Sequence, residues 1–361
     1  MVENYTADMV TRKFIVTMIV FLLMSTIAAK PKGRLHYDFS EVDSYLRKQA
    51  SLKKSKWNGY PAGRIYPDGL SLIVMKDGEI LYDQGYGGMT SESVIPFASG
   101  SKWLAGITVM KSVDDGFLTL DTKTQDVLPY FSGDKGKATL RHLFTHSAGY
   151  PADDPLCLNF DITLEECVRG LSNIQLLSPP GEKLRYSSVS MQIGARMVEV
   201  ATGEDWQTYF YKNVALPLNM KNTDWKAHLE TKNPRIAGAI QSTGKDYIQF
   251  LHMLLNHGIY KKRQYISRDT IDILLKDQTI NAEIESMWQN YRYGIGCFME
   301  KMDEENNGVV VSHPGSIGVA PWIDRSRGVA CVLSASCGFN DTQEVYWTLQ
   351  KLVEKAVDNP K

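Results

Sequence analysis

The chain has 361 residues, of which 43% are hydrophobic and 22% are charged, and these proportions are ordinary for a folded globular protein. Its 40 lysines and arginines balance 41 aspartates and glutamates, so the formal net charge is −1. This balance argues against nucleic acid or an anionic membrane surface as a partner. The length suits one large domain or two smaller ones.

The N-terminus departs from this average composition. Arg12 and Lys13 precede an uncharged, mostly apolar run over residues 14–29, and a basic segment follows at 30–34. This order is typical of a signal peptide over residues 1–29, with small residues for cleavage near 26–29. A spanning helix usually needs roughly 20 apolar residues. We therefore expect a secreted or periplasmic protein, and an uncleaved membrane anchor over residues 14–29 is the alternative.

Five cysteines in an exported chain leave at least one thiol unpaired. Cys157 and Cys167 are ten residues apart in a loop-like region and could form a disulfide, and the sequence leaves this open. Cys297 and Cys331 lie in apolar, strand-like segments and are predicted to be buried thiols. None of the cysteines has the spacing of a zinc site.

The predicted elements form three blocks. Residues 70–75 and 79–86 alternate around Asp77-Gly78, which predicts a β-hairpin, and a helix follows from near Ser99 to residue 114. Residues 121–289 carry mostly helical signals. Strands return in the third block, before a helix at 341–357 closes the chain; they are expected at 293–299, 308–312, 321–324 and 328–335.

Strands at both ends and helices in the middle predict an α+β fold. One antiparallel sheet, flanked by helices, would form from residues 35–120 together with 290–361. An all-helical lobe over 121–289 would be inserted between them. A cleft between two such lobes is a natural place for a functional site, and the helix after Ser99 would open onto it.

The tetrapeptide from Ser99 to Lys102 places a hydroxyl and an amine one helical turn apart. A serine nucleophile needs such an adjacent proton acceptor. Ser-x-x-Lys occurs four times, and at Ser51, Ser132 and Ser242 glycine or clustered charge predicts an exposed turn. Only Ser99 leads into an apolar helix, where its simpler interpretation is a helix N-cap.

Three short elements in order resemble the signature motifs of the serine β-lactamase and penicillin-binding-protein superfamily. They are Ser99-x-x-Lys102, Tyr186-Ser187-Ser188 and His313-Pro314-Gly315. The resemblance covers roughly residues 35–357 and is greatest to the class C-related branch, which includes family VIII esterases and D-aminopeptidases. It implies the β-lactamase/transpeptidase-like fold and a serine hydrolase that works through an acyl-enzyme. It also implies a small-molecule or peptide ester or amide as substrate, with no metal or other cofactor.

The resemblance also assigns roles. Ser99 would be the nucleophile, and Lys102 and Tyr186 would exchange its proton, with Lys102 supplying the positive charge that a tyrosinate needs. The backbone N–H groups of Ser99 and Ser316 would form the oxyanion hole. The residues implied to contact the substrate are Ser188, His313 and Gly315.

Two positions depart from the β-lactamase pattern. Ser188 stands where asparagine is usual, and His313 stands where lysine is usual. Both departures favour an esterase or a peptidase acting on D-amino-acid substrates. A true β-lactamase, an acyltransferase on the same scaffold and a catalytically silent binding protein are the alternatives.

Two further candidates are weaker. His142 and His146 have the spacing of paired metal ligands, but Leu143 stands where a zinc protease motif requires glutamate, so a structural role on a helix is expected. Tyr211-Lys-Asn213 is a rival tyrosine motif on an apparent helix. No metal site is predicted.

Overall fold

The computed structural model describes residues 36–54, 63–64, 68–226 and 230–361. They belong to two compact units, a short one of Met1–Asp38 with Lys355–Lys361 and a large one spanning Phe39–Glu354. In the short unit, His36 and Lys361 exchange two backbone hydrogen bonds of 2.7 and 3.3 Å. The expected signal segment lies outside the described residues. Of the helices in the part that the structure describes, none is long and apolar enough to cross a bilayer.

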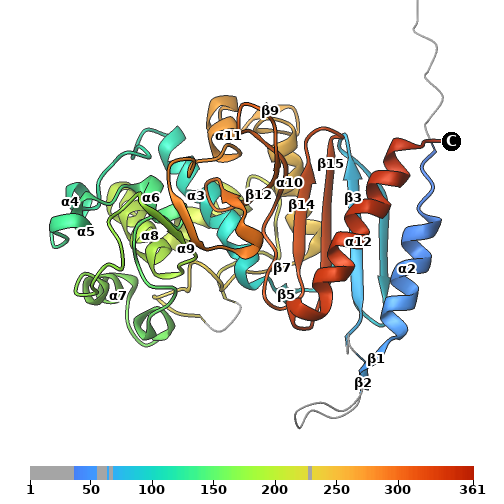
Figure 1. The fold of residues 1–361 in the computed structure, drawn as a ribbon, viewed down its shortest axis with the longest axis horizontal. Helices are drawn as coiled ribbons and strands as arrows, with labels where there is room; N and C mark the ends of the chain where they lie inside the picture. Colours follow the sequence, from blue (N-terminus) through green and yellow to red (C-terminus); the bar gives the residue numbers. More distant parts are fainter. Residues whose placement is uncertain (1–35, 55–62, 65–67, 227–229) are drawn as a thin grey trace, which may run out of the picture. The chain divides into compact units, whose positions relative to one another are not determined.

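Both ends of the large unit contribute to one seven-stranded antiparallel sheet (Figure 1). The expected hairpin is confirmed, and its turn residues Asp77 and Gly78 have φ values of 49° and 85°, which suit a tight two-residue turn. Ile73 of the hairpin lies opposite Val332, so the sheet joins segments far apart in the chain. In sheet order the strands are β11 (Arg292–Tyr293), β12 (Phe298–Met302), β13 (Gly308–Ser312), β14 (Ala320–Asp324), β15 (Val329–Ala335), β3 (Leu70–Lys76) and β4 (Glu79–Tyr86).

The strand expected at residues 293–299 is interrupted, because β11 ends at Tyr293 and β12 begins at Phe298. Between them, Gly296 has φ 79°, and a Cβ there would lie 2.3 Å from the carbonyl oxygen of Lys102. A Cβ on Gly106 would likewise lie 2.3 Å from the carbonyl oxygen of Ile295. The glycines therefore let this segment pass directly against the helix that carries Lys102, and that contact replaces strand pairing.

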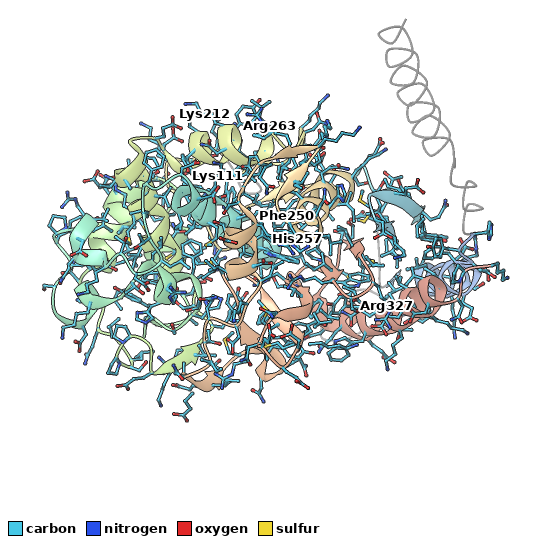
Figure 2. All side chains as sticks on the ribbon, turned by 90° about the horizontal axis from the view of Figure 1, so that it is seen from above. Lys111, Lys212, Phe250, His257, Arg263 and Arg327 are labelled. Atoms are coloured by element: carbon cyan, nitrogen blue, oxygen red, sulfur yellow. The ribbon has the colours of Figure 1, made fainter. Side chains whose placement is uncertain are left out.

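Two helices, α12 (Phe339–Asp358) and α10 (Gly244–Leu255), lie on opposite sides of the sheet (Figure 1). Tyr346 of α12 packs edge-on against Trp322 of β14, with ring centroids 5.4 Å apart. Phe250 of α10 is buried in the interior (Figure 2) and packs edge-on against Trp103 at 5.7 Å. The central strands β3 and β15 are buried along almost their whole length, as two covered faces require.

Helix α3 (Ser101–Asp114) lies between the sheet and the helical part of the chain (Figure 1). Eleven of its fourteen residues are buried, so it has no solvent-facing stripe and belongs to the core. It follows a short 3₁₀ turn, η1 (Ala98–Gly100), which contains Ser99. The start of this buried helix is thus a rigid platform for the Ser-x-x-Lys motif.

Between the hairpin and β11, the chain contains helices together with short strands. Besides α3 and α10, these helices are α4 (Thr124–Val127), α5 (Gly133–Lys137), α6 (Leu140–Phe144), α7 (Leu164–Leu171), α8 (Val189–Thr202), α9 (Trp206–Phe210) and α11 (Arg268–Leu274). Shorter turns are η2 (Pro155–Leu158), η3 (Tyr211–Ala215) and η4 (Trp288–Asn290). The short strands are β5 (Ile95–Pro96), β6 (Lys183–Arg185), β7 (Gln241–Ser242), β8 (Ile259–Tyr260), β9 (Arg263–Gln264) and β10 (Glu283–Ser286). Helix α2 (Ser40–Ser51) and the pair β1 (Lys53–Lys54) and β2 (Gly63–Arg64) precede the hairpin.

Candidate active site

Ser99 and Lys102 meet at the start of α3. Ser99 is partly exposed, whereas Lys102 is buried, with only 1% of its surface exposed. The Lys102 Nζ donates hydrogen bonds to Ser99 Oγ at 3.2 Å and to the carbonyl oxygen of Ala237 at 2.9 Å. The preceding residue, Ala98, has φ 44°, a left-handed conformation that costs a non-glycine residue energy. The backbone is therefore strained next to an accessible hydroxyl that has a buried amine as its partner.

Two short strands bring the Ala237 carbonyl to Lys102. β5 pairs with β7 just before Ser99, and the Phe97 N–H donates to the Ile240 carbonyl at 2.9 Å. The Ile240 N–H in turn donates to Ser101 Oγ at 3.0 Å. These bonds fix the segment whose Ala237 carbonyl holds the Lys102 amine. No local signal in the sequence indicates this contact.

The electrostatics of Lys102 favour its neutral form. The pKa of this lysine is lowered to about 7, mainly by burial and also by the nearby Arg235 cation, while the Asp153 carboxylate opposes the shift. Arg235 and Asp153 form an ion pair with each other. Near pH 7 a large fraction of Lys102 is thus unprotonated and able to accept a proton.

Tyr186 lies in the loop between β6 and α8, with the Lys102 Nζ 4.6 Å from the centroid of its ring. It shares a side-chain hydrogen bond with Ser99, which lowers its pKa, but burial dominates and raises the pKa above the ordinary value. The sequence predicted that charge on Lys102 would stabilise a tyrosinate. The electrostatics instead favour a neutral phenol beside an amine that is about half neutral at pH 7.

His313 follows β13 and is fully buried. Its Nε2 lies 2.8 Å from the Tyr293 hydroxyl and its Nδ1 lies 3.3 Å from the Pro314 carbonyl oxygen. Burial, with the charges of Lys102 and His146, keeps the pKa of His313 well below its usual range, so the ring is neutral. The expectation that His313 projects into a cleft was therefore wrong, because both ring nitrogens have partners within the protein.

His146 belongs to the same cluster, contrary to the expected structural role on a helix. It lies beyond the end of α6, with φ 61°, and its ring lies 4.4 Å from Tyr186 and 4.6 Å from Tyr293. Its Nδ1 accepts the Ser187 N–H at 3.1 Å, which holds the loop after Tyr186. His142, by contrast, accepts the N–H of Thr139, the residue that caps α6, which is a structural role on a helix as expected.

The remaining predicted residues lie around this centre. A Cβ on Gly315 would be 2.2 Å from the Phe97 carbonyl oxygen, so only glycine fits there, and the Gly315 N–H donates to Val319 at 2.7 Å. Ser316 is exposed, and its carbonyl accepts the Phe339 N–H at 2.9 Å. Ser188 is buried, and its N–H donates to the Ala152 carbonyl at 2.7 Å. Ser316 thus faces open space, whereas Ser188 and Gly315 shape the surrounding backbone.

The rival motifs lie apart from this centre. Ser51 and Ser132 are exposed as expected, but the prediction for Ser242 was wrong, since it is buried in β7 with its hydroxyl 2.7 Å from that of Thr223. Strand pairing with β5 overrides the turn signal of the glycine that follows. Tyr211 is 53% exposed on η3.

The cysteines show no disulfide among the described residues. Cys157 and Cys167 are buried free thiols that hydrogen bond to each other, so the bridge that the sequence left open is not formed in this structure. Cys297 and Cys331 are buried thiols, as expected.

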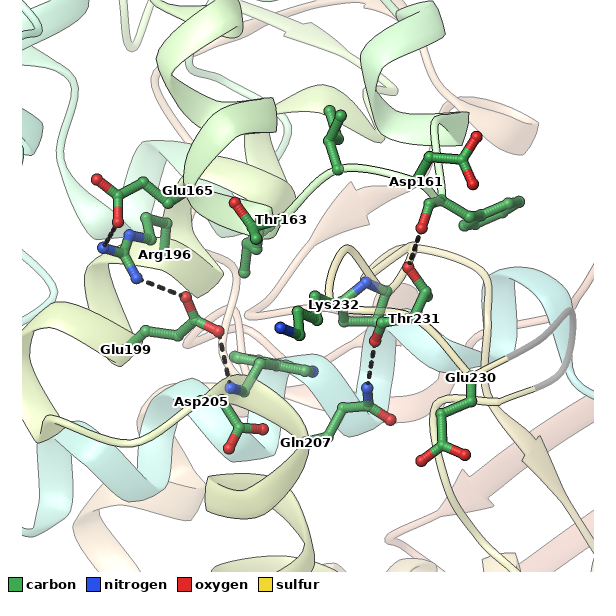
Figure 3. Close-up of a pocket in the computed structure, with 15 residues that line it drawn as sticks. Asp161, Thr163, Glu165, Arg196, Glu199, Asp205, Gln207, Glu230, Thr231 and Lys232 are labelled. Carbon is green, nitrogen blue, oxygen red and sulfur yellow. Dashed lines mark hydrogen bonds and ion pairs between the residues drawn. The ribbon is translucent and has the colours of Figure 1, made fainter.

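Two cavities bear on the location of a substrate. One of about 560 Å³ is lined by Tyr186 and Ser316, next to Ser99. A larger one of about 930 Å³ lies in the helical part, where Arg196 bridges Glu165 and Glu199 (Figure 3). None of the predicted site residues lines the larger cavity, so the smaller one is the candidate substrate site.

Comparison with known proteins agrees with this fold. The family model described as Beta-lactamase matches residues 66–354. The chain belongs to the beta-lactamase family. A Bacteroides dorei protein provisionally described as a beta-lactamase superimposes with a TM-score of 0.78 and 26% identity, over 90% of this chain and 100% of that one. This beta-lactamase-like fold is therefore shared at nearly full length.

Other relatives are more distant. EstCE1, described as a hydrolase with promiscuous acyltransferase activity, has a TM-score of 0.67 and 18% identity, over 89% of this chain and all of that one. Penicillin-binding protein 4 of Amycolatopsis lactamdurans is 30% identical over 164 residues, which are 42% of this chain and 43% of the relative. The chain matches less than half the length of the curated relatives. The match over residues 66–354 thus carries the family assignment, and EstCE1 adds agreement on the fold alone.

Proposed function

We propose that this protein hydrolyses ester or amide bonds through an acyl-enzyme on Ser99, with Lys102 as the base. The observation that carries the proposal is the 3.2 Å contact between Lys102 Nζ and Ser99 Oγ, made by a fully buried lysine whose pKa is lowered to about 7. A buried amine of this kind can remove the proton of a serine hydroxyl near neutral pH.

In the proposed cycle, Ser99 Oγ attacks the carbonyl carbon of the substrate while its proton passes to Lys102. The backbone N–H groups of Ser99 and Ser316 stabilise the negative charge that develops on the carbonyl oxygen. Tyr186, as a neutral phenol, donates a proton to the leaving group and recovers one from Lys102. Water then attacks the acyl carbon and loses a proton to Lys102. As the bond between the acyl carbon and Ser99 Oγ breaks, Lys102 returns this proton to Ser99 Oγ, and the acid is released.

The substrate is proposed to be an ester, or an amide of the kind cleaved by D-amino-acid peptidases, rather than a penicillin. The neutral, internally bonded His313 offers no positive charge for the carboxylate that β-lactams carry. The likeness to EstCE1 keeps acyl transfer to an acceptor other than water as the second candidate.

A fluorophosphonate probe tests the nucleophile. We expect stoichiometric labelling of the wild-type protein and none of Ser99→Ala, while Ser132→Ala, an exposed serine in the same tetrapeptide pattern, labels normally. An unreactive wild-type protein would favour a catalytically silent binding protein. Equal labelling of Ser99→Ala would refute Ser99 as the nucleophile. A panel of p-nitrophenyl esters, D-alanyl peptides and nitrocefin then ranks the substrates, and preferred turnover of nitrocefin would overturn the proposed order.

We also propose export through the N-terminal segment, on the charge and hydropathy pattern of residues 12–34. Mass spectrometry of the mature N-terminus tests it. Cleavage near residues 26–29 supports a signal peptide, and an intact segment in the membrane fraction supports the anchor.

A further inference from the structure

Four aromatic rings line the cavity beside Ser99. Tyr186 and Phe298 stack nearly parallel, with an interplanar angle of 6° and centroids 6.0 Å apart. Trp288 of η4 packs edge-on against Phe298 at 5.3 Å and against Phe339 at 5.5 Å. These four rings come from separate parts of the chain, and all four line the same cavity of about 560 Å³.

The ring of Trp288 is held from outside the cavity as well. Trp347 of α12 stacks against it with an interplanar angle of 8° and a centroid distance of 6.4 Å, and Trp347 does not line the cavity. Tyr291 packs edge-on against it at 5.4 Å. Contacts on several sides fix the orientation of the indole, so it presents a preformed apolar surface to the cavity.

The same cavity lacks charge. None of its lining residues within the described ranges is an aspartate, glutamate, lysine, arginine or histidine. His313 lies behind Phe298, at a centroid distance of 4.8 Å, and is neutral. A carboxylate entering this space would lose hydration without gaining a cationic partner, whereas an apolar group would gain buried contact area.

The position of the cavity relative to the reacting groups shows which part of a substrate it can hold. Ser316, a proposed oxyanion donor, and Tyr186, the proposed proton donor, both line it. The cavity therefore begins at the scissile carbonyl and extends toward Trp288 and Phe339. We propose that it is the specificity pocket for an uncharged aromatic or apolar group attached to that carbonyl. This inference rests on the proposed acyl-enzyme function of Ser99.

Trp288→Ala tests the apolar contact. We expect the ratio of kcat/KM for p-nitrophenyl phenylacetate to kcat/KM for p-nitrophenyl acetate to fall at least about tenfold, as typical for lost apolar contact in a pocket. Trp288→Phe should restore most of the ratio. Phe117→Ala, which removes an aromatic ring that is 49% exposed and outside the cavity, should not change it. A second series keeps the acetyl group and varies the leaving group, by comparing kcat/KM for phenyl acetate with kcat/KM for methyl acetate. A tenfold fall in either series supports the pocket and shows which side of the carbonyl it holds. Unchanged ratios in both series overturn it.

Asn340→Arg tests the absence of charge at the exposed rim of the cavity. We expect the wild-type protein to prefer p-nitrophenyl valerate over p-nitrophenyl hemisuccinate, which carries a carboxylate on a chain of similar length. The arginine should reduce this preference at least about tenfold by supplying a counter-ion. A wild-type protein that prefers the hemisuccinate would contradict the inference.

The two proposals fail separately. Fluorophosphonate labelling of Ser99 reports the nucleophile without needing a substrate group in the cavity. If Ser99 labels normally but neither substrate ratio responds to Trp288→Ala, only the pocket assignment is wrong. If Ser99 does not label, the proposed function itself fails.

Discussion

The lowered pKa of Lys102 predicts a specific pH dependence of Ser99 acylation. The lysine acts as a base only when neutral, so the rate of acylation should fall below its pKa of about 7 and reach a plateau above it. At pH 7 the neutral fraction of an ordinary lysine with a pKa of 10.5 would be about 3 × 10⁻⁴, whereas the neutral fraction of Lys102 is about one half. Burial therefore raises the reactive fraction about a thousandfold at this pH.

The assay is kcat/KM for a neutral p-nitrophenyl ester, or the second-order rate of fluorophosphonate labelling, between pH 5 and about 9.5. At pH 5 the rate should be about a hundredfold below the plateau, since each pH unit below the pKa costs tenfold. A rate that keeps rising tenfold per unit through pH 9, or one that does not change with pH, would refute the assignment of Lys102 as a base with a lowered pKa.

The ion pair beside Lys102 supplies matched variants. Arg235→Ala removes a cation that lowers the Lys102 pKa and leaves Asp153 unpaired, so the fall in rate should move to higher pH. Asp153→Ala removes the opposing carboxylate and should move it to lower pH. Lys212→Ala, at an exposed site on η3 (Figure 2), should leave the profile unchanged. Shifts in the same direction for the first two variants would contradict the electrostatic explanation.

Three further variants test the rest of the site. Lys102→Met should abolish acylation. It should also stabilise the fold by up to roughly 5 kcal/mol below pH 7, because burial depresses the pKa of Lys102 in the folded state, and this gain should shrink as the pH rises from 7 to 10.5. Urea unfolding measures the gain, and a difference that does not change with pH would contradict the prediction. Tyr186→Phe should lower kcat by about 10²–10⁴ with an unchanged far-ultraviolet spectrum, and wild-type turnover would remove the phenol from the mechanism. Gly315→Ala should destabilise the protein by about 1–3 kcal/mol in thermal unfolding, because its Cβ would lie 2.2 Å from the Phe97 carbonyl oxygen. Gly238→Ala is the control, because its Cβ would meet no atom closer than 3.6 Å. Equal costs at the two glycines would show that the clash at Gly315 is relieved.

Local patterns in the sequence predicted much of the fold. The alternation around Asp77 and Gly78 specifies the hairpin, and the apolar run after Ser99 specifies a buried helix. The interruption between Tyr293 and Phe298 could not be read locally, because the close approach of Gly296 to Lys102 requires the tertiary structure. The buried state of Ser242 depends in the same way on pairing with β5.

The sequence predicted only part of the candidate site, because some of its contacts depend on the tertiary structure. The motif residues Ser99, Lys102 and Tyr186 come together as their order suggested. Arg235 and His146 act on this centre from distant loops, and the sequence assigned neither of them to it. Nothing in the sequence places a particular charge beside Lys102.

The most direct test of the proposed function is to trap the acyl-enzyme. The protein is mixed briefly with a p-nitrophenyl ester, quenched in acid, digested and examined by tandem mass spectrometry. We predict that the acyl group is attached to Ser99 in the wild-type protein and that Ser99→Ala carries none. Hydrolysis of the ester by Ser99→Ala at the wild-type rate, or an acyl group found on a different residue, would contradict the proposal that Ser99 is the nucleophile.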